Sequence, residues 1–198
     1  MSMSEPSPNR FVQFLVRRRV PISIAVFGIL MIEDVVRGIV PHDIFDWTDY
    51  RSVAGLLCLM GGLTMRSWAA GFLTKSTQLT MSGPYRLVRN PLYLGSFLMV
   101  VGICLLIGDP ENLWISAVVL ALLYVPKVRS EEHFLASKFP SEWPQYAAST
   151  PRFLPRLTVR PTLSGWRLSQ WLKSREYNAV VATLAAIVAL KALHELHS

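Results

Sequence analysis

Residues 77–95 read TQLTMSGPYRLVRNPLYLG, a polar stretch that runs directly into an apolar one. The Gly-Pro pair at 83–84 marks a turn. Pro91 suits the first turn of a helix, and Asn90 before it suits the cap of that helix. Because the start of a helix leaves N–H groups without partners, this position favours an anionic ligand group.

Charged and aromatic side chains surround this expected helix start. Arg86 and Arg89 add positive charge, and Tyr85 and Tyr93 add flat aromatic surfaces. In a simpler interpretation, the arginines only mark a cytoplasmic loop and the tyrosines only anchor the chain at the membrane surface.

A second polar segment, KVRSEEH at 127–133, follows an apolar stretch. Its adjacent acids, Glu131 and Glu132, can accept hydrogen bonds from an ammonium group or from ribose hydroxyls. Adjacent acids beside basic residues are also typical of a solvated helix end, so this segment alone does not indicate a site.

The composition indicates which elements must position these residues. Of the 198 residues, 52% are hydrophobic and only 17% are charged, against about 25% charged in average globular domains. A membrane-spanning helix needs roughly 20 mostly apolar residues, and five stretches come close: 20–40, 52–73, 92–107, 113–125 and 178–193. We expect an all-α, multi-pass transmembrane helical bundle in a single domain over residues 1–198. Four spans form its core, and the fifth follows a cytoplasmic surface segment.

Ionisable residues lie inside two of these stretches. Glu33, Asp34 and Arg37 belong to the first, and Arg66 belongs to the second. Such residues are tolerated when they face the interior of a bundle and pair with one another, and Glu33 and Arg37 have the required i,i+4 spacing. Alternatively, these charges only sit near the membrane surface.

Basic residues predict the orientation, because cytoplasmic loops collect Lys and Arg. They gather before the first stretch, between the second and third, and throughout 127–175, where five prolines at 140–161 exclude one continuous helix. The connections after the first and third stretches are acidic instead. The N-terminus and both basic connections are therefore predicted to be cytoplasmic.

The net charge of +7 is spread over connections that alternate with apolar stretches. This distribution favours anionic membrane lipids as partners and not nucleic acid. Cys58 and Cys104 lie inside predicted spans, without a CxxC or a His/Cys cluster. Neither a disulfide framework nor a metal site is predicted.

The topology brings residues 77–95 and 127–133 to the same membrane face, at the ends of neighbouring spans. Together they offer an arginine for a carboxylate, a glutamate for an ammonium group or a ribose hydroxyl, and a tyrosine for a purine ring. These are the groups that recognise a zwitterionic nucleoside such as S-adenosylmethionine.

The chain resembles the isoprenylcysteine carboxyl methyltransferase and phospholipid methyltransferase group of integral membrane enzymes. The resemblance covers about residues 64–156. It is carried, in order, by Leu79, Gly83, Tyr85, RNPLY at 89–93, Glu131-Glu132, FPSEWPQY at 139–146 and PRFLP at 151–155.

The resemblance implies a cofactor pocket for S-adenosylmethionine, without a Rossmann fold, and a lipid-like methyl acceptor. It implies cofactor contacts at Thr77, Gln78, Leu79, Thr80, Tyr85, Asn90, Pro91, Leu92, Tyr93 and Glu131. Arg89 and Glu132 are implied as catalytic residues, and Lys127 as a substrate-binding residue. The chain departs from the pattern at Asn90, where the family has a histidine, and at the Thr77-Gln78 pair. Asparagine still donates and accepts hydrogen bonds but does not titrate near neutral pH.

A sulfonium methyl group is already activated, so the protein mainly has to align it with the acceptor and exclude water. A carboxylate acceptor requires no general base. An amine or hydroxyl acceptor requires one, and Glu131 or Glu132 is then the candidate.

Two alternatives stay open. Membrane reductases of the sterol reductase type are similar in the same region but bind NADPH, and they are usually longer chains. A non-catalytic membrane scaffold is the other alternative, and Asn90 is the residue that favours it.

Overall fold

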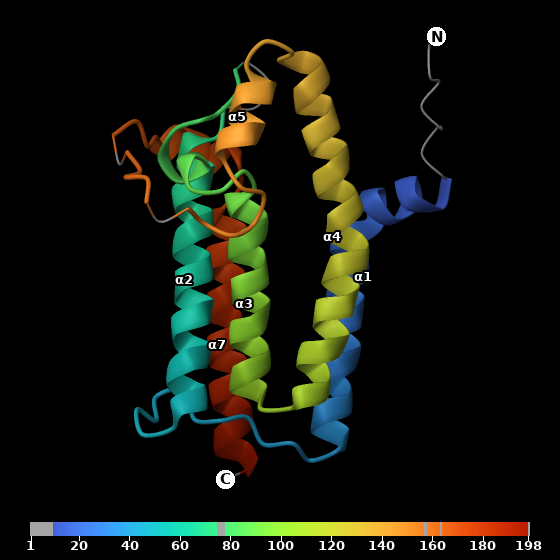
Figure 1. Cartoon of the computed structure of the whole chain (residues 1–198). Helices are drawn as coiled ribbons and strands as arrows, with labels where there is room; N and C mark the ends of the chain where they lie inside the picture. Colours follow the sequence, from blue (N-terminus) through green and yellow to red (C-terminus); the bar gives the residue numbers. More distant parts are fainter. Residues whose placement is uncertain (1–9, 75–77, 157, 163, 198) are drawn as a thin grey trace.

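A computed structural model describes residues 10–74, 78–156, 158–162 and 164–197. All regular elements in these residues are helical. Figure 1 shows long helices running between the two ends of the molecule and shorter ones gathered at one end. The elements are α1 (Arg10–Val36), α2 (Tyr50–Phe72), the 3-10 helix η1 (Gly83–Arg86), α3 (Pro91–Ile107), α4 (Pro110–Lys138), α5 (Trp143–Ser149), α6 (Leu168–Lys173) and α7 (Tyr177–His197). The predicted all-α, multi-pass bundle is confirmed.

Three of the helices, α2, α4 and α7, are long and apolar enough to cross a membrane, and α3 is a shorter apolar helix of 17 residues. The fourth predicted span, residues 113–125, is only the middle of α4, which has 29 residues. Asp109 begins this helix by accepting a hydrogen bond from the Glu111 N–H, and Pro126 inside the helix does not end it. The apolar run therefore predicted only part of α4 and missed the polar residues at both ends of the helix.

Helix α1 has two parts that run in different directions (Figure 1). Its beginning projects sideways from the bundle, and the rest runs alongside α4. Pro21 lies inside the helix, and an internal proline removes a backbone hydrogen bond and kinks a helix. The part after Pro21 corresponds to the first predicted span.

Glycines let α2 and α3 approach each other closely. A Cβ atom on Gly62 would lie 2.5 Å from the Gly95 carbonyl oxygen, and one on Gly102 would lie 2.6 Å from the Leu59 nitrogen. Small residues at such contacts are how membrane helices pack without a hydrophobic driving force between them. The pairing fixes where the first residues of α3 lie relative to α2.

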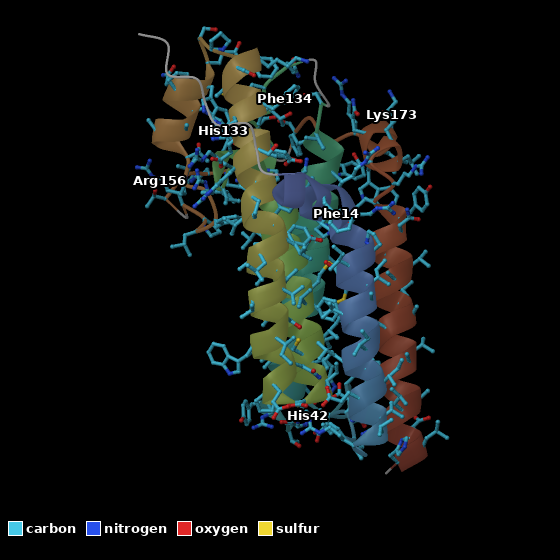
Figure 2. All side chains as sticks on the ribbon, turned by 90° about the vertical axis from the view of Figure 1, so that its right-hand side faces the viewer. Phe14, His42, His133, Phe134, Arg156 and Lys173 are labelled. Atoms are coloured by element: carbon cyan, nitrogen blue, oxygen red, sulfur yellow. The ribbon has the colours of Figure 1, made fainter. Side chains whose placement is uncertain are left out.

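The two ends of the bundle differ in charge. The basic end holds the start of α1 and residues 78–90, 139–156, 158–162 and 164–176, whereas the acidic end holds the connections at 37–49 and 108–109 (Figure 1). In the turned view, Lys173 lies at the basic end and His42 at the acidic end (Figure 2). The predicted alternation of the connections is therefore present, while the side of the membrane that each end faces stays a prediction.

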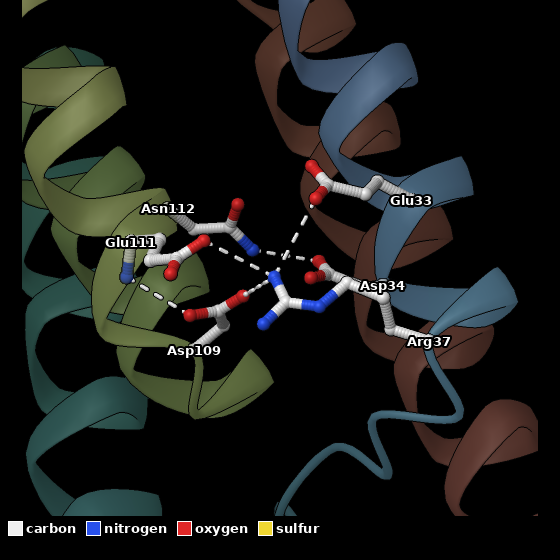
Figure 3. Close-up of polar contacts among 6 residues, drawn as sticks. All are labelled: Glu33, Asp34, Arg37, Asp109, Glu111 and Asn112. Carbon is white, nitrogen blue, oxygen red and sulfur yellow. Dashed lines mark hydrogen bonds and ion pairs between the residues drawn. The ribbon is translucent and has the colours of Figure 1, made fainter.

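Polar contacts join α1 to α4 at the acidic end (Figure 3). The Arg37 guanidinium lies 3.1 Å from Asp109 and 3.2 Å from Glu111, closer than the 3.5 Å to the predicted partner Glu33. Asn112 donates to the buried carboxylate of Asp34 at 2.6 Å. Asp34 thus faces the bundle as expected for a charge within a span, whereas Glu33 lies at the exposed surface.

Candidate functional site

A cavity of about 590 Å³ opens at the basic end, a size within the usual range for small-molecule sites. Helices α1 to α4, residues 73–74 and 78–90, and the α5 segment all contribute to its wall. The residues that line it are Arg19, Arg66, Leu73, Thr74, Gln78, Leu79, Thr80, Tyr85, Arg89, Asn90, Pro91, Leu92, Tyr93, Ser96, Tyr124, Glu131, Glu132, Phe134, Leu135, Phe139, Trp143 and Tyr146.

The structure brings most of the predicted site residues together on this wall. Eleven of the thirteen line the cavity: Gln78, Leu79, Thr80, Tyr85, Arg89, Asn90, Pro91, Leu92, Tyr93, Glu131 and Glu132. Lys127 is not among the lining residues but pairs with Glu131 at 2.9 Å. Thr77 lies outside the described residues. The roles of these residues stay predictions.

The segment before α3 is held by the chain that follows α4. Gly83 has φ +60°, and a Cβ atom there would lie 2.7 Å from the Phe72 ring, so the predicted turn requires glycine. The Tyr146 hydroxyl donates to the Tyr85 carbonyl at 2.9 Å, and the Arg89 N–H donates to the Pro151 carbonyl at 2.8 Å. Residues 139–155 therefore fix the loop that presents Tyr85 and Arg89.

Two buried donors at the cavity have no partner within the described part of the chain. They are the Tyr85 hydroxyl and the Arg89 Nε atom. Burial raises the pKa of the Tyr85 phenol, so this hydroxyl stays protonated and can donate. The Arg89 guanidinium also lies 5.9 Å from the centre of the Trp143 ring, a cation–π distance. Since buried polar atoms usually have partners, both donors point to a ligand with acceptor atoms.

The buried Glu132 carboxylate is the centre of a polar network. Arg152 donates to its carboxylate from Nε at 3.0 Å and from a terminal nitrogen at 2.6 Å. Asn90 donates to Oε1 at 3.1 Å, and a terminal nitrogen of Arg89 lies 3.5 Å from Oε2. Both carboxylate oxygens are already occupied by donors, so this arrangement favours a supporting role over that of a proton acceptor.

The predicted helix cap is confirmed only in part. Helix α3 begins at Pro91, as predicted, and Asn90 holds the cap position, but its side chain makes no capping hydrogen bond. It donates instead to Glu132 and, at 3.3 Å, to the Arg152 carbonyl. The amide turns away from the helix start because a buried, charged acceptor is within reach, and such a hydrogen bond is stronger than a neutral one.

Glu131 has a different environment from its neighbour. Its side chain is 40% exposed and pairs with Lys127 one helical turn earlier. The rings of Tyr93 and Tyr124 meet edge to face, with centroids 5.5 Å apart, where α3 and α4 approach each other. Both tyrosines line the cavity.

Sequence reasoning missed several residues of the site. Trp143 and Arg152 belong to the segments 139–146 and 151–155 that carry the family resemblance, but no site role was predicted for either of them. Arg66 was recognised only as a charge within a span, although an ionisable residue at that depth is itself a signal of a site. Its carboxylate partner is Glu176, at 2.7 Å. No spacing rule connects residues 110 positions apart.

Comparison with known proteins gives one family and three relatives. Residues 57–142 match the family model described as phospholipid methyltransferase. The chain is 36% identical over 160 residues to the nickel-cobalt-cadmium resistance protein NccN of Alcaligenes xylosoxydans xylosoxydans, a match that covers 77% of this chain and 72% of NccN. No solved structure matches the chain significantly.

The other two relatives match over shorter ranges. The cobalt-zinc-cadmium resistance protein CzcN of Cupriavidus metallidurans is 36% identical over 57% of this chain, and the match spans 52% of CzcN. The protein-S-isoprenylcysteine O-methyltransferase of Schizosaccharomyces pombe is 27% identical over 52% of this chain, and the match spans 48% of that enzyme. Each of these matches thus spans about half the length of the relative.

Proposed function

Because this chain belongs to the phospholipid methyltransferase family of integral membrane proteins, we propose that it is an S-adenosylmethionine-dependent methyltransferase. The acceptor is a lipid-like or isoprenylated molecule with a carboxylate or an amine, and the reaction takes place at the cytoplasmic membrane face. One observation carries the proposal. Three separate segments, at 78–93, 131–132 and 143–146, line a single cavity that holds two buried donors without partners.

The residues of the cavity fit a zwitterionic nucleoside. The Arg89 guanidinium and the neutral Tyr85 hydroxyl supply donors for a carboxylate. Trp143 and Tyr93 supply aromatic surfaces beside them, and the Glu131 carboxylate supplies an acceptor for an ammonium group or for hydroxyls. When bound, the cofactor supplies a methyl group on a sulfonium centre, which is already activated for transfer.

The chain itself has to orient the two reactants and exclude water. Tyr93 and Tyr124, from α3 and α4, give the cavity an aromatic wall that suits an apolar acceptor. Glu132 holds Asn90 and Arg89 in place through its hydrogen bonds and ion pair. It is therefore assigned a positioning role in place of the catalytic role that the sequence suggested.

The two acids differ in how available they are as a base. The Glu132 carboxylate is already bonded to Arg152 and Asn90, whereas Glu131 is half-exposed and has Lys127 as its ion-pair partner. A carboxylate acceptor needs no base. For an amine acceptor, Glu131 is the group that can accept the proton, because proton acceptance requires an available lone pair.

The product of the reaction tests the proposal directly. The purified protein is reconstituted in nanodiscs made from a total membrane lipid extract and incubated with methyl-labelled S-adenosylmethionine, and lipids are then analysed by mass spectrometry. We expect label in one class of lipid-like molecule, and far less with Arg89→Ala. If no lipid class carries label although the protein still binds the cofactor, the scaffold alternative is favoured.

A further inference from the structure

The C-terminal segment lies beyond the family-matched residues 57–142, yet it docks on the helix that forms one wall of the cavity. The Trp166 indole N–H donates to the Ser67 carbonyl at 3.1 Å, and the Arg167 N–H donates to the Gly71 carbonyl at 3.0 Å. A Cβ atom on Gly71 would overlap the Trp166 ring. Helix α7 then runs back along the bundle beside α2 and α3 (Figure 1).

At the start of α7, the buried Glu176 binds Arg66 through two parallel hydrogen bonds. Arg66 Nε lies 2.7 Å from Oε1, and one terminal nitrogen lies 3.0 Å from Oε2. The Glu176 side chain is only 3% exposed, whereas 25% of the Arg66 side chain is exposed. The carboxylate of the pair is therefore buried, whereas the guanidinium side chain is partly exposed.

The other terminal nitrogen of Arg66 is fixed by α3. It donates to the Ser96 hydroxyl at 2.5 Å and lies 3.4 Å from the Leu92 carbonyl. Gly95 leaves the space for the Arg66 side chain, because a Cβ atom at Gly95 would lie 2.6 Å from Arg66 Cγ. Arg66, Leu92 and Ser96 all line the cavity, so the guanidinium is held in one orientation on its wall.

Stability alone is a weak reason for such a pair. Replacing a buried ion pair by apolar residues is often neutral or stabilising, because the desolvation of both charges offsets their attraction. Ionisable residues at membrane depth usually mark a functional path. Arginine also presents a planar set of donors that lysine does not reproduce.

The charges around the cavity favour an anionic ligand group at this depth. Three arginines line it, Arg19, Arg66 and Arg89, against two glutamates. Each of these glutamates has a further cationic partner that is not among the lining residues, since Glu131 pairs with Lys127 and Glu132 pairs with Arg152. Arg66 is itself paired with Glu176. Among the described residues, the ion-paired groups at the cavity are thus four cations, Arg66, Arg89, Lys127 and Arg152, and three carboxylates, Glu131, Glu132 and Glu176, which leaves one net positive charge.

We propose that Arg66 binds an anionic group of the methyl acceptor and that Glu176, from the C-terminal segment, is the residue that positions it. The proposal rests on the proposed function and narrows it to acceptors that carry a carboxylate or a phosphate near the methylated atom. The last forty residues thereby gain a role, because they complete the acceptor site.

The test uses the full-length protein in nanodiscs and two acceptors, N-acetyl-S-farnesylcysteine for a carboxylate and phosphatidylethanolamine for a phosphate next to an amine. We expect Glu176→Gln and Arg66→Lys to raise the KM of the accepted molecule about tenfold or more, the effect of losing a hydrogen bond to a charged group. The kcat value and the affinity for S-adenosylhomocysteine should change less than twofold. Glu176→Asp should raise the KM less than Glu176→Gln does, because it keeps the carboxylate.

Lys191→Met is the matched control, because Lys191 pairs with Asp43 at 3.1 Å and anchors the other end of α7. An equal rise in KM for Lys191→Met would assign Glu176 to helix packing alone and overturn the inference. An unchanged KM in Glu176→Gln and Arg66→Lys would overturn it while leaving the proposed function intact. If the unsubstituted protein methylates neither acceptor nor any lipid, the proposed function fails and the inference fails with it.

Discussion

Asn90 donates a hydrogen bond from Nδ2 to Glu132 Oε1 at 3.1 Å, between the first turn of α3 and the buried face of α4. The family pattern has a histidine at this position, and an imidazole N–H can make the same donation. The contact therefore explains how an asparagine can serve at this position. It donates a hydrogen bond, and this role does not require a group that titrates.

Substitutions of Asn90 separate donation from titration. We expect Asn90→His to retain activity and Asn90→Ala to lose roughly tenfold or more, because the alanine removes a hydrogen bond to a buried carboxylate. If the position served as a titrating group, Asn90→His would instead raise activity and add a pH dependence near about 6.5. A pH-rate profile of the three proteins distinguishes these outcomes.

Asn112→Ala is the control for this series, because Asn112 also donates to a buried carboxylate, that of Asp34 at 2.6 Å, but at the acidic end. Its activity per folded molecule should stay near that of the unsubstituted protein. Full activity in Asn90→Ala would make Asn90 a replaceable residue.

Arg152 and Glu132 should behave as one unit. We expect Arg152→Met and Glu132→Gln each to lower the thermal midpoint in detergent, and the double variant to lose less than the sum of the two. Arg152→Met leaves the buried Glu132 carboxylate without its closest cation, and Glu132→Gln weakens the hydrogen bonds that Arg152 and Asn90 donate to it. A double-mutant cycle should give a coupling energy of about 1 to 3 kcal/mol. Additive losses would show that the two side chains do not depend on each other.

Glu131→Gln removes an acceptor's charge and keeps its volume. We expect S-adenosylhomocysteine to bind more weakly by about 1.5 to 3 kcal/mol, the usual value for a hydrogen bond to a charged group. Calorimetric titration measures the change. Glu111→Gln is the control, because Glu111 also forms an exposed ion pair, with Arg37 at 3.2 Å, far from the cavity. If Glu131→Gln binds S-adenosylhomocysteine as tightly as the unsubstituted protein does, the acid pair is only a solvated helix end.

Tyr85→Phe should have opposite effects on stability and binding. Without ligand, the variant should be more stable, because a buried hydroxyl without a partner costs about 1 to 3 kcal/mol. With S-adenosylhomocysteine, it should be stabilised less than the unsubstituted protein. Thermal midpoints with and without ligand measure both effects. A loss of stability without ligand would mean that the hydroxyl has a partner.

The same residue sets a pH dependence. Burial raises the folded-state pKa of Tyr85, whereas the unfolded chain has a tyrosine pKa of about 10. Below about pH 10 the phenol is neutral in both states, so its contribution is constant. As the pH rises further, only the unfolded state loses the proton, and stability falls. In Tyr85→Phe, stability should therefore fall less steeply as the pH rises above about 10.

Some of the site could be read from the sequence because its determinants are local. The turn at 83–84 and the start of α3 at Pro91 follow from the backbone limits of glycine and proline. The length of α4 could not be read in this way, because polar residues after Val125 continue the helix beyond the apolar run. The partners of Glu132 and Arg66 were missed for a different reason. These partners are Arg152 and Glu176, and their positions depend on how the chain folds back after α4.

The central claim is that the cavity between residues 78–93 and α4 binds S-adenosylmethionine. Its most direct test is a calorimetric titration of the purified protein with S-adenosylhomocysteine and, separately, with NADPH. The account predicts saturable binding of S-adenosylhomocysteine, weakened by Arg89→Ala, and no binding of NADPH. Saturable binding of NADPH without binding of S-adenosylhomocysteine would contradict it and favour a reductase.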